Sequence, residues 1–141
     1  MTLPSIGFRL LTVAHRALYR ASGGRLFGHV GPLGVLLLTT TGRRSGRSRT
    51  VPLLYGPAGG GFVLIASMGG SPRDPGWCSN LRANPNAVVE IGRRRLPVRA
   101  RFAEGEERRR LWELMVDGYS GYAGYEQRTE RRIPVVVLEP R

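Results

Sequence analysis

The stretch VLLLTTTGRRSGRSRTVPLLY, residues 35–55, decides the class of fold. Its first part, Val35–Thr41, has the composition of a strand and ends at Gly42, and Thr50–Tyr55 is a second run of the same kind. Two such runs on either side of a glycine-containing turn predict a pair of antiparallel strands. The chain also contains 20 glycines and 10 prolines, which favour short strands and tight turns over a helical bundle.

Shorter signals along the chain complete this prediction. Four more runs have the composition of strands: Phe62–Ser67, Ala87–Ile91, Leu96–Phe102 and Ile133–Leu138. Three stretches have helical signals: Ile6–Ala21, Trp77–Ala83 and Glu104–Asp117. Asp74 and Pro75 fit the N-cap and the first position of the second helix.

These elements predict an α+β fold, a small barrel of about six mostly antiparallel strands with peripheral helices. We divide the chain into an N-terminal amphipathic helix, residues 1–24, and a barrel, residues 25–141. Arg9, Arg16 and Arg20 form a stripe beside the apolar face of that helix. The helix either docks on the barrel or touches the anionic inner face of a membrane. The sequence leaves both interpretations open, and the oligomeric state as well.

The net charge of +12 predicts an anionic partner. Nucleic acid, anionic lipid and a small molecule rich in phosphate and carboxylate would all satisfy this charge. A nucleic-acid-binding barrel is disfavoured, because the aromatic residues are not interleaved with the basic residues as stacking platforms are. We therefore expect a small-molecule partner and no nucleic acid.

Cysteine and histidine usage bears on compartment and metal binding. Cys78 is the one cysteine, so no internal disulfide forms, which suits a cytoplasmic protein. His15 and His29 stand in unrelated contexts, so no metal site is expected. No run reaches the roughly 18 apolar residues that span a bilayer. Arg9 and Arg16 interrupt the apolar N-terminal stretch, so a signal peptide is not expected either.

The turn within residues 39–49 is the most informative motif for function. It carries four arginines around two glycines: Arg43, Arg44, Arg47 and Arg49. Glycines allow close backbone approach, and turn N–H groups can hold an anion. Arginine supplies forked donors for phosphate and carboxylate. The alternative is a solvated basic hairpin that binds nothing.

Tyr119, Tyr122 and Tyr125 form a second motif, because residues three apart on a helical turn present their rings on one face. In a core, each hydroxyl would need a hydrogen-bond partner. A pocket wall is therefore one interpretation, and ordinary packing aromatics are the other.

The chain carries six motifs in this order: T-T-G-R-R-S-G-R, R-T-V-P-L, A-S-x-G-G, P-x-W-x-x-N-L-x-A-N-P, Y-x-x-Y-x-x-Y and R-x-I-P-V-V-V-L. Together they cover Leu33 to Pro140 and resemble the deazaflavin-dependent nitroreductase family of actinobacteria. The resemblance implies a split β-barrel like that of flavin reductases and pyridoxamine-phosphate oxidases. It also implies the 8-hydroxy-5-deazaflavin coenzyme F-420 rather than FMN. That coenzyme carries a phosphodiester and an oligoglutamate tail, which would account for the arginines of the turn.

The resemblance also implies which residues form the site. Twelve residues would bind the cofactor: Arg43, Arg44, Ser45, Gly46, Arg49, Val51, Pro52, Leu53, Ala66, Ser67, Trp77 and Asn80. Four would line the substrate pocket: Leu54, Tyr119, Tyr122 and Tyr125. In catalysis, Ser67 would donate a hydrogen bond to the accepting group, and Tyr122 or Tyr125 would deliver a proton.

Three positions depart from the family pattern, namely Leu54, Met68 and Gly76. The family often has lysine at the second of these, and the known nitroreductase has an aromatic and a bulky residue at the other two. The acceptor is therefore expected to differ from a nitroimidazole. We expect hydride transfer from reduced F-420 to an organic acceptor such as a quinone, an enone or a nitro compound. The alternative is a non-catalytic protein that carries a deazaflavin or a flavin.

Overall fold

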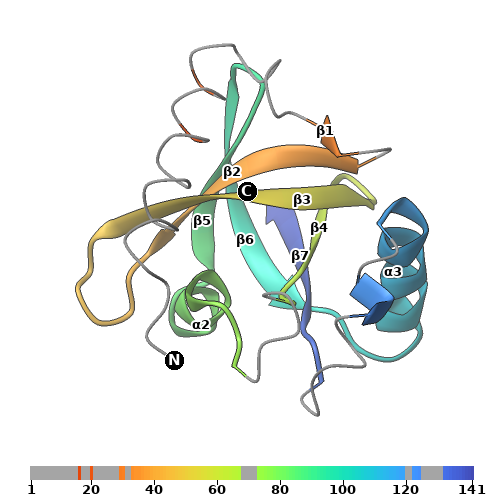
Figure 1. The fold of residues 1–141 in the computed structure, drawn as a ribbon. Coiled ribbons are helices and arrows are strands. Elements are labelled where there is room, and N and C mark those ends of the chain that lie inside the picture. Colours follow the sequence, from red (N-terminus) through yellow and green to blue (C-terminus); the bar gives the residue numbers. More distant parts are fainter. Residues whose placement is uncertain are drawn as a thin grey trace.

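The structure is a computed structural model, and it describes residues 16, 20, 29–30, 33–67, 73–119, 122–124 and 132–141 (Figure 1). The strands in this part of the chain are β1 (His29–Val30), β2 (Leu33–Thr41), β3 (Ser48–Ala58), β4 (Gly61–Ile65), β5 (Asn86–Ile91), β6 (Arg94–Phe102) and β7 (Val135–Pro140). The long helices are α2 (Gly76–Ala83) and α3 (Gly105–Gly118).

The strands form one antiparallel sheet that closes on itself. Their order is β1-β2-β3-β4-β7-β6-β5, and β5 returns to pair with β2, where Leu38 lies opposite Val89. β1 only adds two residues to the edge of β2, so the barrel itself consists of six described strands. The predicted antiparallel barrel is confirmed. Figure 1 shows α2 below β2 and β5, and α3 on the opposite side of the barrel, beside β4 and β7.

Alternating side chains divide the core into two parts. Along β4, Leu64 belongs to the cluster inside the barrel, whereas Ile65 belongs to the cluster between the barrel and α3. In β7, Val136 belongs to the cluster inside the barrel and Val137 to the cluster beside α3. Met115 of α3 is part of this second cluster. The last predicted strand is apolar without interruption because both of its faces are covered. Burial of each such side chain stabilises the fold by about 1.5–3 kcal/mol.

Helix α2 begins differently from the prediction. Pro75, not Asp74, holds the N-cap position, in an extended conformation with φ −63° and ψ 154°, and the cap has no side-chain hydrogen bond. The Pro75 carbonyl accepts the first bond of the helix, from the Cys78 N–H at 3.0 Å. The carboxylate of Asp74 lies 3.7 Å from the guanidinium of Arg82 instead. The prediction of Asp74 as the cap was therefore wrong.

Most other boundaries agree with the prediction within two residues. β6 begins at Arg94, earlier than expected, because a tight turn with Gly92 at φ 61° pairs Ile91 directly with Arg94. Helix α3 has Glu106 and Glu107 in its first turn, as expected. These acids face the positive end of the helix dipole and stabilise it.

Most of the predicted N-terminal helix lies outside the described residues. Arg16 and Arg20 are described, and both are helical. Among the described helices, none has the length and the apolar composition needed to cross a membrane.

Candidate active site

The turn between β2 and β3 is closed by its own hydrogen bonds. The Gly42 N–H donates to the Arg47 carbonyl, and the Gly46 N–H donates to the Gly42 carbonyl, both at 2.8 Å. The Arg47 N–H also donates to the Ser45 hydroxyl at 3.1 Å. Gly46 has a φ of 72°, which a residue with a side chain rarely adopts. A Cβ on Gly42 would lie 2.7 Å from the Ser45 Oγ and 3.1 Å from the Arg47 carbonyl oxygen, so a larger residue there would crowd the turn.

Asn80 of α2 holds this turn against the barrel. Its Oδ1 accepts from the Arg43 N–H at 3.1 Å and from the Arg43 Nη1 at 2.9 Å. Its Nδ2 donates to the Thr40 Oγ1 at 3.0 Å, and both side chains are buried. Asn80 therefore positions Arg43, and its predicted role in supporting the cofactor stays a prediction. The sequence interpretation missed Thr40. The available signal was that Thr40 follows Leu36 and Leu38 at every second position of β2, so its hydroxyl faces the interior of the barrel.

The turn amides are mostly occupied by protein acceptors. Four of them donate within the protein: Gly42, Arg43, Gly46 and Arg47. These four amides do not support the expectation that turn N–H groups hold an anion. The guanidinium groups remain for that role, and Arg44, Arg47 and Arg49 are exposed around the turn.

Strand β3 has a long edge that no other described strand covers. β2 pairs with the opposite edge from Ser48 to Tyr55, whereas β4 pairs only with Gly56–Ala58. Pro52 in the middle of this segment suits an edge strand, because proline lacks an N–H. Apart from the Thr50 carbonyl, which accepts a hydrogen bond from Arg16, this edge presents peptide groups that no described strand pairs and that can bind a planar polar ring.

Several predicted cofactor-binding residues meet beside this edge. Val51 and Leu53 are half-buried, and they pack against the same cluster that contains Ala66 and Trp77. Pro52 points to the opposite face of the strand, since side chains alternate. Val51 and Leu53 thus present apolar side chains on the face that is nearest to α2.

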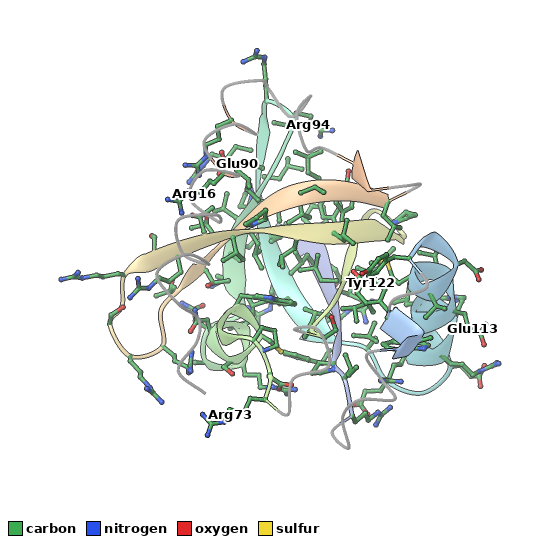
Figure 2. The ribbon with its side chains drawn as sticks, viewed as in Figure 1. Arg16, Arg73, Glu90, Arg94, Glu113 and Tyr122 are labelled. Carbon is green, nitrogen blue, oxygen red and sulfur yellow. The ribbon has the colours of Figure 1, made fainter. Side chains whose placement is uncertain are left out.

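The predicted substrate-binding residues meet on the other side, near α3. Tyr122 is 5% exposed and belongs to the cluster between the barrel and α3, against which Leu54 and Tyr119 also pack. The Tyr119 and Tyr122 rings lie edge to face, with centroids 5.0 Å apart. This burial agrees with the packing interpretation of Tyr122 and leaves its catalytic role a prediction. Figure 2 shows Tyr122 beside α3.

Ser67 follows two residues that belong to different clusters. β4 ends at Ile65 of the α3-side cluster, and Ala66 belongs to the interior cluster with Trp77. The Ala66 N–H donates to the Pro134 carbonyl at 3.0 Å, which fixes the backbone just before Ser67. Ser67 itself is buried. The predicted residues Tyr125 and Met68 lie outside the described part of the chain.

The two described arginines of the N-terminal helix contact the barrel. The Arg16 Nη1 donates to the Thr50 carbonyl at 3.2 Å. Arg20 forms a two-bond ion pair with Glu90, with distances of 3.1 and 2.6 Å, and Figure 2 shows Arg16 and Glu90 on the same side of the barrel. The sequence interpretation missed Glu90. A single acid within the apolar run of β5, opposite an arginine stripe, was the signal.

The described groups with shifted pKa values belong to ion pairs outside the candidate site. Arg101 donates to both carboxylate oxygens of Glu107, at 2.6 and 2.8 Å, and lies 3.2 Å from Glu139. The hydrogen bonds from Arg101 lower the pKa of Glu107 below its usual range and raise that of the guanidinium. The network joins β6, α3 and β7, so it serves the fold.

The residues of the site fit a flat ring with an anionic end. Exposed guanidinium groups surround the β2–β3 turn, and an uncovered strand edge with apolar side chains continues from it. Such a donor set suits a polyanionic flavin-like cofactor. In the described part of the chain, no group of three or more His, Cys, Asp or Glu side chains could hold a metal ion.

Comparison with known proteins agrees with this geometry. The family model described as F420H(2)-dependent quinone reductase matches residues 11–140. An F420H(2)-dependent quinone reductase of Mycobacterium tuberculosis (strain ATCC 25618 / H37Rv) is 40% identical over 141 residues, which cover 96% of this chain and 93% of that protein.

Two solved structures are also similar. An F420-H2 dependent reductase, FDR-A, is 44% identical with a TM-score of 0.69, and the match covers 74% of this chain and 93% of that one. A domain-swapped dimer is 37% identical with a TM-score of 0.71, and the match covers 96% of this chain and all of that one (100%). The chain therefore belongs to the F420H(2)-dependent quinone reductase family and is a deazaflavin-dependent oxidoreductase.

Proposed function

We propose that this chain transfers hydride from reduced coenzyme F-420 to a quinone. The observation that carries the proposal is the continuity between the arginine-rich turn and the uncovered edge of β3. When bound, the reduced coenzyme supplies the hydride. The protein binds and orients the two reactants and excludes water.

The cofactor side of the site is assigned to the turn, β3 and α2. Arg43, Arg44 and Arg49 would bind the phosphodiester and the glutamate tail, around the turn formed by Ser45 and Gly46. The arginine exposure and the bond from Arg43 to Asn80 support this assignment.

The ring is assigned to the uncovered edge, along Val51, Pro52 and Leu53. Trp77 would support it from α2, and Ala66 and Ser67 would border its reactive edge. Val51 and Leu53 are half-buried and pack against the cluster that contains Ala66 and Trp77, which supports this assignment.

The acceptor side is assigned to Leu54, Tyr119, Tyr122 and Tyr125. A hydroxyl in a water-poor environment is a suitable proton donor to the reduced acceptor, and Tyr122 or Tyr125 is assigned this role. Ser67 would hydrogen-bond to the accepting oxygen. Enones and nitro compounds have the same requirement for a flat pocket and a donor, so they are secondary acceptors of the proposal.

Gly76 is exposed and borders open space that a larger residue would occupy. A Cβ at this position would meet no atom within 4 Å. The known nitroreductase has a bulky residue here, so this chain would accept a wider ring system beside Trp77. We propose this space, together with Leu54, as the basis of its acceptor preference.

We propose that the N-terminal helix docks on the barrel rather than on a membrane. Arg16 and Arg20 of its basic stripe already contact Thr50 and Glu90, so these two charges face the protein. The division into residues 1–24 and 25–141 is part of this proposal, and the cytoplasmic location stays a prediction.

Turnover tests the proposed function. Purified protein with reduced F-420 and menadione should oxidise the coenzyme, which is followed by the return of deazaflavin absorbance. Binding without oxidation of the coenzyme by any quinone, enone or nitro compound would favour a carrier protein.

A further inference from the structure

A second basic pocket lies between α2, the end of β6 and the start of α3. Its volume is about 200 Å³. Nine residues line it: Arg82, Phe102, Ala103, Glu104, Arg108, Arg132, Ile133, Pro134 and Val135. None of them belongs to the proposed coenzyme or acceptor site.

Three guanidinium groups and one carboxylate, that of Glu104, line the pocket; the Asp74 carboxylate lies 3.7 Å from the Arg82 guanidinium, and a net positive charge remains. Two of the arginines are held in place by the protein. The Arg82 guanidinium carbon lies 4.2 Å from the centroid of the Phe102 ring. The Arg108 Nη2 donates to the Ile133 carbonyl at 2.7 Å. Each guanidinium carries five N–H donors, so a positioned arginine can still bind a ligand.

The rest of the lining is apolar, formed by Phe102, Ala103, Ile133, Pro134 and Val135, of which Phe102 and Pro134 are partly exposed. The partly exposed Phe102 and Pro134 beside the arginines suit a carboxylate with a short aliphatic stem, since the stem covers their apolar surface and the carboxylate accepts bidentate bonds. A phosphate ion has no aliphatic stem that could pack on these apolar side chains. The volume is below the usual range for drug-sized ligands, so the ligand group is small.

We infer that this pocket binds a glutamate-like carboxylate. Two sources have this chemistry, a free dicarboxylate and a glutamyl unit of the coenzyme tail. The second source rests on the proposed function. Helix α2 connects the two regions: the Gly76 carbonyl at its start is 3.5 Å from the Arg43 Nη1, and Arg82 stands in its last turn. Eight residues of helix span about 12 Å, which a flexible tail of several residues covers.

Calorimetric titration of the full chain with sodium glutarate tests the inference. Glutarate should bind, and inorganic phosphate should bind more weakly. Arg132→Ala should raise the Kd for glutarate about tenfold, because it removes a charged donor. Glu104→Gln should lower the Kd for glutarate, because it removes a carboxylate that repels the ligand. Glu104 is the N-cap residue of α3, but its side chain makes no capping hydrogen bond, so the helix should be little affected.

Arg94→Ala is the matched control, because it changes the net charge equally. Arg94 and Phe102 stand at the two ends of β6, about 26 Å apart at 3.3 Å per residue, and Figure 2 shows Arg94 at the β5–β6 turn. Absence of glutarate binding would overturn the inference. Equal weakening by Arg94→Ala and Arg132→Ala would also overturn it, as would unchanged affinity in Glu104→Gln.

Coenzyme binding identifies the source of the carboxylate. If the tail occupies the pocket, Arg132→Ala weakens binding of tailed F-420 but not of the tail-less deazaflavin, and glutarate competes only with the tailed form. If the ligand is a free dicarboxylate, both coenzyme forms bind Arg132→Ala as they bind the wild type. Either result supports a carboxylate site. Binding of the tail-less form to the wild type tests the proposed function separately.

Discussion

Replacement of Asn80 by leucine should loosen the β2–β3 turn and destabilise the fold. Leucine has a similar size, but it removes the three hydrogen bonds that Asn80 makes to Arg43 and Thr40. A hydrogen bond contributes about 0.5–1.5 kcal/mol net, and one with a charged group contributes about 1.5–3 kcal/mol. Because Asn80 and Thr40 are buried, water replaces the lost partners poorly. We therefore expect Asn80→Leu to lose about 3 kcal/mol, which corresponds to roughly 6–12 °C in Tm.

The control variants separate this cause from general damage. Asn80→Asp keeps oxygen acceptors for Arg43, and the Thr40 hydroxyl can donate to the new carboxylate, so the loss should stay below about 1 kcal/mol. Asn86→Ala changes an exposed asparagine of β5 and should remain within about 0.5 kcal/mol of the wild type. Urea unfolding, followed by tryptophan fluorescence, measures the free energy of each variant. If the free energy of unfolding of Asn80→Leu equals that of Asn86→Ala, Asn80 does not hold the turn.

Four further predictions concern the site, the ion network and the N-terminal helix. Arg49→Ala should weaken F-420 binding by about 1.5–3 kcal/mol without loss of the fold, as measured by calorimetry; unchanged affinity would place the coenzyme elsewhere. Tyr122→Phe or Tyr125→Phe should lower the turnover of a quinone while coenzyme affinity and Tm change little; wild-type turnover in both would assign the proton to Ser67 or water. The lowered pKa of Glu107 means that its stabilising effect is present above its ordinary pKa and is lost as the pH falls through the folded-state value. Glu107→Gln should therefore flatten the acid side of the stability curve in low salt, and an unchanged curve would refute this. Deletion of residues 1–22 should yield less soluble protein if the helix docks; well-folded protein that no longer sediments with anionic vesicles would support membrane contact instead.

Much of the barrel could be predicted from the sequence because strand signals are local. The hairpin around residues 35–55 and the run in β7 each combine strand-forming residues with a turn or with burial on both faces. The start of α2 could not be predicted in this way. Asp74 and Pro75 have the right composition for a cap, yet Arg82 and the Pro75 conformation decide the outcome. Such a decision depends on contacts that only the folded chain brings together.

The candidate site, like the fold, could be predicted from the sequence only in part. The arginine turn was visible as a motif, but its amides turned out to bond within the protein. Asn80 was singled out for the cofactor, and its described partners are Arg43 and Thr40. The Arg20–Glu90 pair joins residues that are 70 positions apart, which no local pattern reveals. Spacing therefore predicts a chemistry for the site, whereas the contacts of Asn80 and Glu90 required the structure.

The choice of cofactor tests the central claim most directly. Fluorescence titration of the purified chain with F-420 and with FMN, followed by addition of menadione to the reduced form, measures binding and hydride transfer in one experiment. We predict tighter binding of F-420 than of FMN, and oxidation of reduced F-420 by the quinone. Equal or tighter binding of FMN, or a bound reduced F-420 that no quinone oxidises, would contradict the assignment of the arginine turn and β3 to a deazaflavin-dependent quinone reductase.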